Sequence, residues 1–290
     1  MLRWIIGLTK PVRYGIEDML YRRSSEKEHL AGLKDLHKGK PMLIVGNGPS
    51  INKTPLEKFS SIPSIGMNKI DMLFDRSGWR PSLIMCTNNL VVKQHSDGFS
   101  ASTIPVYLAW KSRWFLRKRS NSIHFFNLRN DEQFSSDVSL GMGSGATVTY
   151  AALQLAYHMG ANPVIIVGVD HNFDKSGAAN VYEKRSGADT NHFDPNYFKD
   201  GSYWGVPNLD ASEEVFLKSR IAFEQDGRKI YDATIGGKLQ TFEKIGIEEA
   251  VKLAELGSEI RQATGEYCAD GLDSLSVSLT NKTPSALPDR

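Results

Sequence analysis

A glycine-rich loop follows the first strongly apolar stretch of the chain and has the composition of a phosphate- or sugar-binding loop. Its sequence is LIVGNGPSINKTP, residues 43–55. Glycines placed directly after a buried strand let backbone N–H groups approach an anionic ligand closely. The loop is not a dinucleotide fingerprint, because Ile51 stands at the third glycine position, and it is not a P-loop, because Asn52 precedes Lys53. A tight strand-to-helix turn without a ligand is the alternative. The candidate binding residues in this loop are Gly46, Asn47, Gly48 and Ser50.

Polar residues also follow several other apolar runs. Asn68 follows the second run, Asn88 follows the third, and Asp170 ends the run VIIVGVD. The pair Ser144–Gly145 precedes the longest helical pattern, where a helix N-terminus favours a phosphate. Asparagine offers both a donor and an acceptor, which suits a nucleobase edge and a ribose. If these residues converge on one crevice, they form a nucleotide-binding site.

These residues converge if the apolar runs form a parallel sheet. The runs are short, rich in β-branched residues and mostly without alternation, as expected for strands buried on both faces. Alternation of strand and helix patterns predicts an α/β fold with a doubly wound, mostly parallel, Rossmann-like sheet. Such sheets bind ligands beyond the carboxyl ends of their strands, where the strand order reverses. The expected strands are residues 42–47, 64–68, 82–87, 104–110, 123–128, 163–170 and 229–234.

Three helical patterns and one irregular segment lie between these strands. We expect helices at residues 69–78, 146–161 and 211–227, the last with its cap region at Ser212–Glu214. Residues 171–210 carry no periodic pattern but many Gly, Asp, Asn, Tyr and Phe residues. A loop of that length inside a compact domain is typical of a lid or a binding loop.

The chain divides into three parts. We expect residues 1–39 to form an N-terminal helical segment and residues 40–256 to form a nucleotide-binding, catalytic domain that includes the lid, residues 171–210. The tail, residues 257–290, is rich in Ser, Thr and Pro near its end, and we expect it to be disordered.

The composition is that of an ordinary globular protein. Of 290 residues, 40% are apolar and 23% are charged, and the net charge of +2 is too small to indicate nucleic acid as a partner. Cys86 and Cys268 provide neither a disulfide framework nor a zinc-binding spacing, and they fit a reducing cytoplasm. No apolar run approaches the roughly 18 residues of a membrane span. We therefore expect a cytoplasmic location, with a peripheral contact to the inner membrane if the two segments described next bind lipid. The sequence leaves open whether the protein forms a homo-oligomer.

Two segments combine basic and aromatic residues. The N-terminal sequence MLRWIIGLTKPVRYGIEDMLYRR is either a helix packed on the main domain or an interfacial anchor, with Trp4, Ile5, Ile6 and Leu8 in lipid beside Arg3, Lys10 and Arg13. The segment WKSRWFLRKR, residues 110–119, is either a solvated helix face or a docking patch for an acidic glycolipid or an anionic membrane. A binding site for single-stranded nucleic acid is the least favoured interpretation of residues 110–119, because the rest of the chain has no excess of basic residues.

Several of these motifs together resemble a known superfamily. They are LIVGNGPSI, GMNKI, MCTNN, GSGATVTYAALQLAYHMGA, VIIVGVDHNF and NHFDP, within residues 40–245. The resemblance is to bacterial lipooligosaccharide sialyltransferases, motility-accessory-factor transferases that glycosylate flagellin, and archaeal hydroxymethylpterin pyrophosphokinases. It implies a glycosyltransferase that uses a nucleotide-activated sugar, CMP-linked and of the nonulosonic-acid type. The acceptor would be a glycan or a glycolipid in the assembly of surface polysaccharide, lipopolysaccharide or glycoprotein.

The sialyltransferase branch also implies roles for single residues. Asn47, Asn68 and the Ser144–Gly145 helix start would hold the CMP half of the donor, with Asn88 as a further contact. His192, in the lid motif TNHF, would be the base. Where a sialyltransferase has aromatic residues after Gly-Ile-Asp, this chain has His171-Asn172-Phe173, so the resemblance does not identify the donor sugar. The lid tyrosines expected to steady the departing phosphate are Tyr182, Tyr197 and Tyr203.

The chemistry of glycosyl transfer is compatible with these residues. The reaction needs a base for the acceptor hydroxyl and stabilisation of the leaving phosphate. The chain contains no Asp-x-Asp motif of the kind that binds a divalent metal beside UDP- or GDP-sugars, so we expect an inverting reaction that needs no metal and no cofactor. A histidine titrates near neutral pH and suits the role of base, with His192 as the first candidate and His171 as the second.

Two other functions remain open. Pyrophosphoryl transfer would need Mg²⁺ held by carboxylates, for which the chain offers Asp170, Asp174, Asp189 and Asp194. A non-catalytic nucleotide sensor would bind CMP or ATP without turnover. Dependence on Mg²⁺ separates the first alternative from metal-independent glycosyl transfer.

Overall fold

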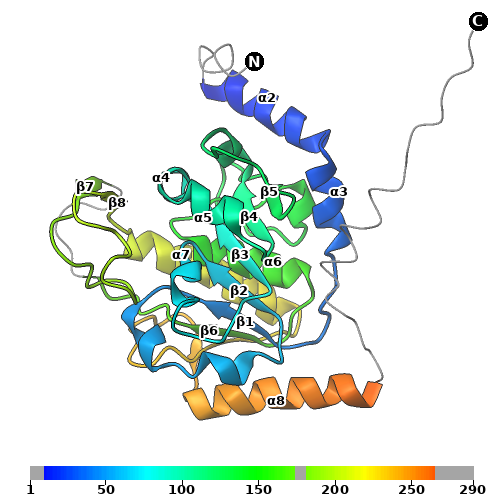
Figure 1. Cartoon of the computed structure of the whole chain (residues 1–290). Coiled ribbons are helices and arrows are strands. Elements are labelled where there is room, and N and C mark those ends of the chain that lie inside the picture. Colours follow the sequence, from blue (N-terminus) through cyan, green and yellow to red (C-terminus); the bar gives the residue numbers. More distant parts are fainter. Residues whose placement is uncertain (1–9, 174–180, 265–290) are drawn as a thin grey trace, which may run out of the picture.

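The computed structural model describes residues 10–173 and 181–264 and has an α/β architecture (Figure 1). Eight strands form a sheet in the order β10-β9-β6-β1-β2-β3-β4-β5, and every pair of neighbours is parallel. The expected α/β class with a parallel sheet is therefore confirmed, and each of the seven expected runs contains a strand. The strands are β1 (Met42–Val45), β2 (Ser64–Met67), β3 (Leu83–Cys86), β4 (Val106–Ala109), β5 (Ile123–Phe126), β6 (Val164–Val167), β9 (Ile230–Asp232) and β10 (Glu243–Lys244).

The central strands are short runs that are buried on both faces. Every residue of β1, β2, β3, β4 and β6 is buried, which explains why these runs are continuously apolar instead of alternating. The strand order reverses between β1 and β6, because β2 to β5 lie on one side of β1 and β6, β9 and β10 lie on the other. Val45 pairs with Gly66 of β2 and with Val167 of β6, so the three strands end at the same level. A crevice at this reversal is the usual ligand site of such a sheet.

The helices and short 3₁₀ turns flank the sheet. α6 (Val148–His158) is buried along most of its length and contacts β1, β2 and β3. The longer helices are α2 (Lys10–Arg22), α3 (Ser25–Gly32), α7 (Leu209–Gln225) and α8 (Ile247–Thr264), and the short ones are α4 (Asn89–Gln94) and α5 (Ser96–Ala101). The 3₁₀ turns are η1 (Pro49–Lys53), η2 (Leu56–Phe59), η3 (Ile70–Leu73), η4 (Trp110–Trp114) and η5 (Val138–Leu140).

Three expectations about helices need correction. The helix expected at residues 69–78 is only the short turn η3, because Ile70 and Leu73 are enough to bury its apolar side. α7 begins at Leu209 and not at residue 211, and its N-cap is Asn208 and not the region Ser212–Glu214. The Asn208 side chain accepts a hydrogen bond from the Ala211 N–H at 3.0 Å. The start of the tail expected at residue 257 falls inside α8, which continues to Thr264.

The lid contains a small antiparallel hairpin in the part that the structure describes. It is formed by β7 (Tyr182–Lys184) and β8 (Tyr203–Gly205) and lies apart from the main sheet (Figure 1). Residues 174–180, which include Asp174, lie outside the described residues. So do residues 1–9, with the expected anchor residues Trp4, Ile5, Ile6 and Leu8, and residues 265–290, with Cys268. Within residues 10–173 and 181–264, no helix combines the length and the apolar character needed to cross a bilayer.

The first prediction concerns the contact between β1 and β6. A Cβ on Gly46 would lie 2.2 Å from the carbonyl oxygen of Gly168, which is backbone and cannot rotate away. Gly46→Ala should therefore lower the free energy of unfolding by about 1–3 kcal/mol, the usual cost of overpacking. Gly78→Ala is the matched control, because a Cβ there meets nothing within 4 Å. Urea unfolding measures both variants, and equal stability of the two would contradict this account of the contact.

Candidate functional site

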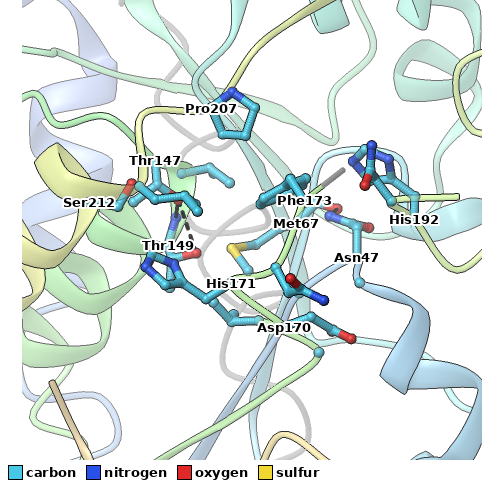
Figure 2. Close-up of a pocket in the computed structure, with 18 of the residues that line it drawn as sticks. Asn47, Met67, Thr147, Thr149, Asp170, His171, Phe173, His192, Pro207 and Ser212 are labelled. Carbon is cyan, nitrogen blue, oxygen red and sulfur yellow. Dashed lines mark hydrogen bonds between the residues drawn. The ribbon is translucent and has the colours of Figure 1, made fainter. Parts of the chain in front are cut away.

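A cavity of about 140 Å³ lies where the strand order reverses. Its walls come from the carboxyl ends of β1, β2 and β6, the N-terminus of α6, the start of α7 and the lid. Figure 2 shows His192 and Asn47 on one side of it and His171 and Thr149 on the other. Because sites for small molecules usually measure roughly 300–1,000 Å³, a nucleotide sugar would fill the cavity only in part unless the lid shifts. The lining residues are Gly46, Asn47, Gly48, Met67, Asn68, Ala146, Thr147, Val148, Thr149, Gly168, Val169, Asp170, His171, Asn172, Phe173, Asn191, His192, Pro207, Leu209, Ser212 and Phe216.

The glycine-rich loop and Asp170 are bonded to each other. The N–H and hydroxyl of Ser50 donate to the Asp170 carboxylate at 3.1 and 2.7 Å, and a Cβ on Gly48 would overlap that carboxylate. Burial raises the pKa of Asp170 above its ordinary value, although both bonds from Ser50 act in the opposite direction. The structure thus brings Gly46, Gly48 and Asp170 to the cavity, whereas Ser50 holds Asp170 and does not line the cavity.

Two asparagines that line this cavity have buried side-chain oxygens. Asn47 is 9% exposed, and its Nδ2 donates to the Met67 carbonyl oxygen at 2.9 Å. Asn68 follows β2 in the left-handed region, with φ of 51°. Among the described residues, neither Asn47 Oδ1 nor Asn68 Oδ1 has a hydrogen-bond partner, although both atoms are buried. Because a buried acceptor without a donor costs free energy, both oxygens fit a ligand that supplies hydroxyl or amino hydrogens.

The N-terminus of α6 faces the cavity, but not through the residues expected. The N-cap is Thr147, whose hydroxyl accepts from the Thr149 N–H at 3.2 Å (Figure 2). Ser144 and Gly145 precede this cap and do not line the cavity. The Ser144 N–H donates to the Asp131 carbonyl, and a Cβ on Gly145 would lie 2.6 Å from the Tyr150 ring.

Asn88 also lies away from the cavity. It is exposed and caps α4, accepting from the Leu90 N–H at 2.8 Å.

His171 lines the opposite wall and is held by α7. Its Nε2 lies 3.1 Å from Glu213 Oε1, and its backbone has φ of 52°. The Glu213 carboxylate also accepts from the Thr241 hydroxyl. His171 is therefore fixed by a contact on the α7 side of the cavity.

His192 forms a dyad with Asp189. Its Nδ1 lies 2.9 Å from Asp189 Oδ2, and the side chain of Asp189 is almost fully buried. The Asn191 and Phe198 N–H groups also donate to this carboxylate, at 2.9 and 3.3 Å. Burial raises the pKa of Asp189, but the hydrogen bond and charge of His192, the Asn191 N–H and the charge of Arg185 together leave it below its ordinary value. An ionised carboxylate only accepts hydrogen bonds, so the contact favours a proton on Nδ1, and in the neutral tautomer of that kind Nε2 is the acceptor.

The three lid tyrosines are not brought together. Tyr182 and Tyr203 lie on the hairpin, 61% and 52% exposed, and do not line the cavity. Tyr197 is buried: its ring stacks on His192 with centroids 4.0 Å apart, and its hydroxyl accepts from the Lys69 N–H at 3.3 Å. In this arrangement Tyr197 packs against the His192 ring, and Tyr197 does not line the cavity.

Sequence reasoning missed Lys69, a buried lysine next to Asn68. Its Nζ donates to the Tyr197 carbonyl oxygen at 2.6 Å and lies 4.5 Å from the Phe198 ring centroid. Burial lowers its pKa to about 8. Lys69 thus joins the end of β2 to the part of the lid that carries His192. The sequence gives no signal for this role, because a lysine after a strand is normally exposed.

Comparison with known proteins places the chain in a family. The chain is a Rossmann-like α/β protein with a cavity at the strand-order reversal. A family model described as "6-hydroxymethylpterin diphosphokinase MptE-like" matches residues 20–176, more than half of the chain. The chain belongs to this MptE-like family. The match covers β1 to β6 and ends before Asp189 and His192.

Two further comparisons concern solved structures and curated proteins. The solved structure of a MAf glycosyltransferase from Magnetospirillum magneticum AMB-1 is similar at 15% sequence identity and a TM-score of 0.48, over 81% of this chain and 41% of that chain. The chain therefore spans about two fifths of the length of that protein. Among curated proteins, none matches the chain in sequence.

The second prediction concerns Lys69. The pKa of Lys69 is about 8 in the folded protein, below that of an exposed lysine. Above about pH 8 the unfolded chain therefore binds more protons than the folded chain. The wild type should gain stability relative to Lys69→Met as the pH rises from 8 to 10, by up to about 1.4 kcal/mol per pH unit. Urea unfolding across this range measures the difference. The exposed Lys58→Met is the control and should show no such trend; a difference for Lys69→Met that is independent of pH would contradict the prediction.

Proposed function

We propose that the protein is a transferase that binds a nucleotide-activated substrate in this cavity and uses His192 as the general base toward an acceptor hydroxyl. The observation that carries the proposal is the Asp189–His192 dyad at the cavity wall, beside the buried acceptor oxygen of Asn47 (Figure 2). The reaction we favour is glycosyl transfer from a CMP-linked sugar of the nonulosonic-acid type. The motifs of the glycine-rich loop and the strand ends support this reading.

The residues suit an inverting displacement. Asp189 fixes the tautomer and orientation of His192, so Nε2 takes the proton of the acceptor hydroxyl. The acceptor oxygen then bonds to the anomeric carbon while the bond from that carbon to the phosphate oxygen breaks, and CMP departs with the bonding electrons. Asn47 Oδ1 and Asn68 Oδ1 would accept from ribose hydroxyls or a base amino group. The N-terminus of α6 at Thr147 would stabilise the leaving phosphate.

Pyrophosphoryl transfer is the second candidate, favoured by the name of the family. It would need carboxylates free to hold Mg²⁺ beside a triphosphate. Asp170 is bonded to Ser50, Asp189 to His192, and Asp194 lies 3.7 Å from Arg76. These contacts favour the histidine base over a magnesium site built from these three aspartates. Both reactions transfer a group to a hydroxyl, so the dyad could serve either, and the nucleotide and metal requirements separate them.

The third prediction concerns nucleotide binding. Asn47→Ala and Asn68→Ala should each weaken CMP binding by about 1–3 kcal/mol, since each removes an acceptor that a ligand donor would otherwise satisfy. Asn88→Ala is the control: it should leave the affinity unchanged and cost about 1 kcal/mol of stability through loss of the α4 cap. Calorimetric titration with CMP, UMP, GDP and ATP measures the affinities. Wild-type CMP affinity in both cavity variants would remove these asparagines from the site.

The fourth prediction concerns the base. His192→Ala should lower kcat by roughly 10²–10⁴-fold with little change in nucleotide affinity. Asp189→Asn should also lower kcat, because its amide can donate to Nδ1 and favour the tautomer with the proton on Nε2. Wild-type activity should rise with pH as the imidazole loses its proton, and EDTA should leave it unchanged.

The measurement is a pH–rate profile with saturating donor for the wild type, both dyad variants and His171→Ala. If His171→Ala abolishes turnover while His192→Ala retains it, the base is His171. If Mg²⁺ proves essential with ATP as the donor, the pyrophosphokinase replaces the glycosyltransferase.

A further inference from the structure

A basic and apolar surface lies at the β5 end of the molecule, separate from the cavity. It consists of residues 12–23, on α2 and directly after it, and residues 110–119, on and after η4, and we call it the α2–η4 surface. Together with Lys10, these two segments carry nine basic and two acidic residues, a net charge of +7 in a chain whose total is +2. The remaining residues are therefore net acidic, so these two segments carry the excess positive charge of the chain. Asp97 of α5 offsets part of it, because its carboxylate lies 2.9 Å from Arg117.

Buried contacts join the two segments into one surface. Glu17 is 4% exposed and accepts from Arg113 Nη2 at 2.5 Å and from Trp114 Nε1 at 3.3 Å. Lys111 Nζ lies 3.5 Å from the Tyr14 ring centroid. The other acidic residue, Asp18, accepts from Arg22 and from Asn127. Both carboxylates are thus engaged within the fold.

Large apolar side chains stand exposed in both segments. Val12 and Met19 are 51% and 43% exposed on α2, and Trp114 and Phe115 are 37% and 40% exposed at the end of η4. Val12 and Met19 are seven residues apart and share one face of α2, the face opposite Tyr14 and Glu17, which contact η4. Arg23, Lys118 and Arg119 are exposed in the same segments. Exposed apolar residues among basic ones are typical of surfaces that rest in the headgroup region of a bilayer.

The α2–η4 surface has a fixed relation to the cavity. η4 begins at Trp110, directly after the carboxyl end of β4, and the cavity lies at the carboxyl ends of β1, β2 and β6. All of these strands are parallel, so both features lie along one edge of the sheet. β2 and β4 are two strands apart, a separation of roughly 10 Å. Figure 1 shows α2 projecting beyond the β5 end of the sheet.

We propose that the α2–η4 surface docks on an anionic lipid bilayer and places the sheet edge with the cavity beside the membrane. Charge complementarity favours an anionic partner, and the exposed aliphatic side chains Val12 and Met19 favour lipid over nucleic acid, since an aliphatic chain buries in the acyl boundary but does not stack on bases. Two of the aromatic rings are covered by cations, with Lys111 over Tyr14 and Arg113 over Trp114 at 4.3 Å. The proposal does not depend on which transfer reaction the cavity performs.

The fifth prediction tests this surface with the full chain and sedimented vesicles. The wild type should bind vesicles of phosphatidylcholine with 30% phosphatidylglycerol at least tenfold more tightly than vesicles of phosphatidylcholine alone, and 0.5 M salt should weaken the binding. Arg23→Glu with Lys118→Glu, and separately Met19→Ser with Phe115→Ser, should each reduce binding at least tenfold. All four positions are exposed, so the fold should persist, which thermal melting checks.

The control is Lys58→Glu with Lys252→Glu, the same charge change at exposed sites outside the α2–η4 surface, and it should retain most of the wild-type binding. Equal binding of the wild type to both kinds of vesicle would overturn the proposal. So would wild-type binding by both surface variants. Loss of binding to a single-stranded oligonucleotide in the charge variant, without any effect on vesicles, would assign the surface to nucleic acid instead.

Discussion

The site depends on the close approach of β1 and β6 at the reversal of strand order. β1 pairs with β2 on one side and β6 on the other, and its last residue leads directly into Gly46 and Asn47. Gly46 and Gly168 pass so closely that a side chain on Gly46 would meet the Gly168 carbonyl. The Gly46 N–H donates to the Val167 carbonyl, and the Gly48 N–H to that of Gly168. These contacts set Asn47 and Asp170 at one crevice, although they lie far apart in the sequence.

The lid is positioned by the same strand ends. The Phe193 N–H donates to the Asn47 carbonyl at 2.9 Å, and the Phe193 carbonyl accepts from Asn52 and Arg76. His192 is therefore held next to the loop that carries the first acceptor oxygen. Lys69 bonds the lid at Tyr197, whose ring stacks on His192. An imidazole that is held by stacking and by backbone bonds of the neighbouring residue has a fixed orientation, which suits the proposed role as general base.

The sequence predicts the fold well because the central strands are buried on both faces and their apolar runs are unambiguous. It also predicts that polar residues after β1, β2 and β6 converge, since parallel strands end at one edge. Residues near that edge are harder to place. Asn88 follows β3, but it serves as a helix cap and faces solvent, a role that asparagine performs equally well. The helix start at Ser144–Gly145 is displaced to Thr147, because threonine is also a good cap and the glycine packs against Tyr150.

The lid is the part of the chain whose structure the residue pattern does not predict. Its residues have no period, so nothing in the sequence distinguishes the buried Tyr197 from the exposed Tyr182 and Tyr203. From the sequence, Asp189 is a candidate magnesium ligand, whereas its bond to His192 emerges only from the turn that the chain makes at residues 189–192.

The most direct measurement of the central claim is a crystal structure of the full chain with CMP. The account predicts ribose hydroxyls or a base amino group within hydrogen-bond distance of Asn47 Oδ1 and Asn68 Oδ1, the phosphate at Thr147, and His192 Nε2 facing the acceptor side. A nucleotide bound elsewhere, or one in this cavity with both asparagine oxygens still without a donor, would contradict it.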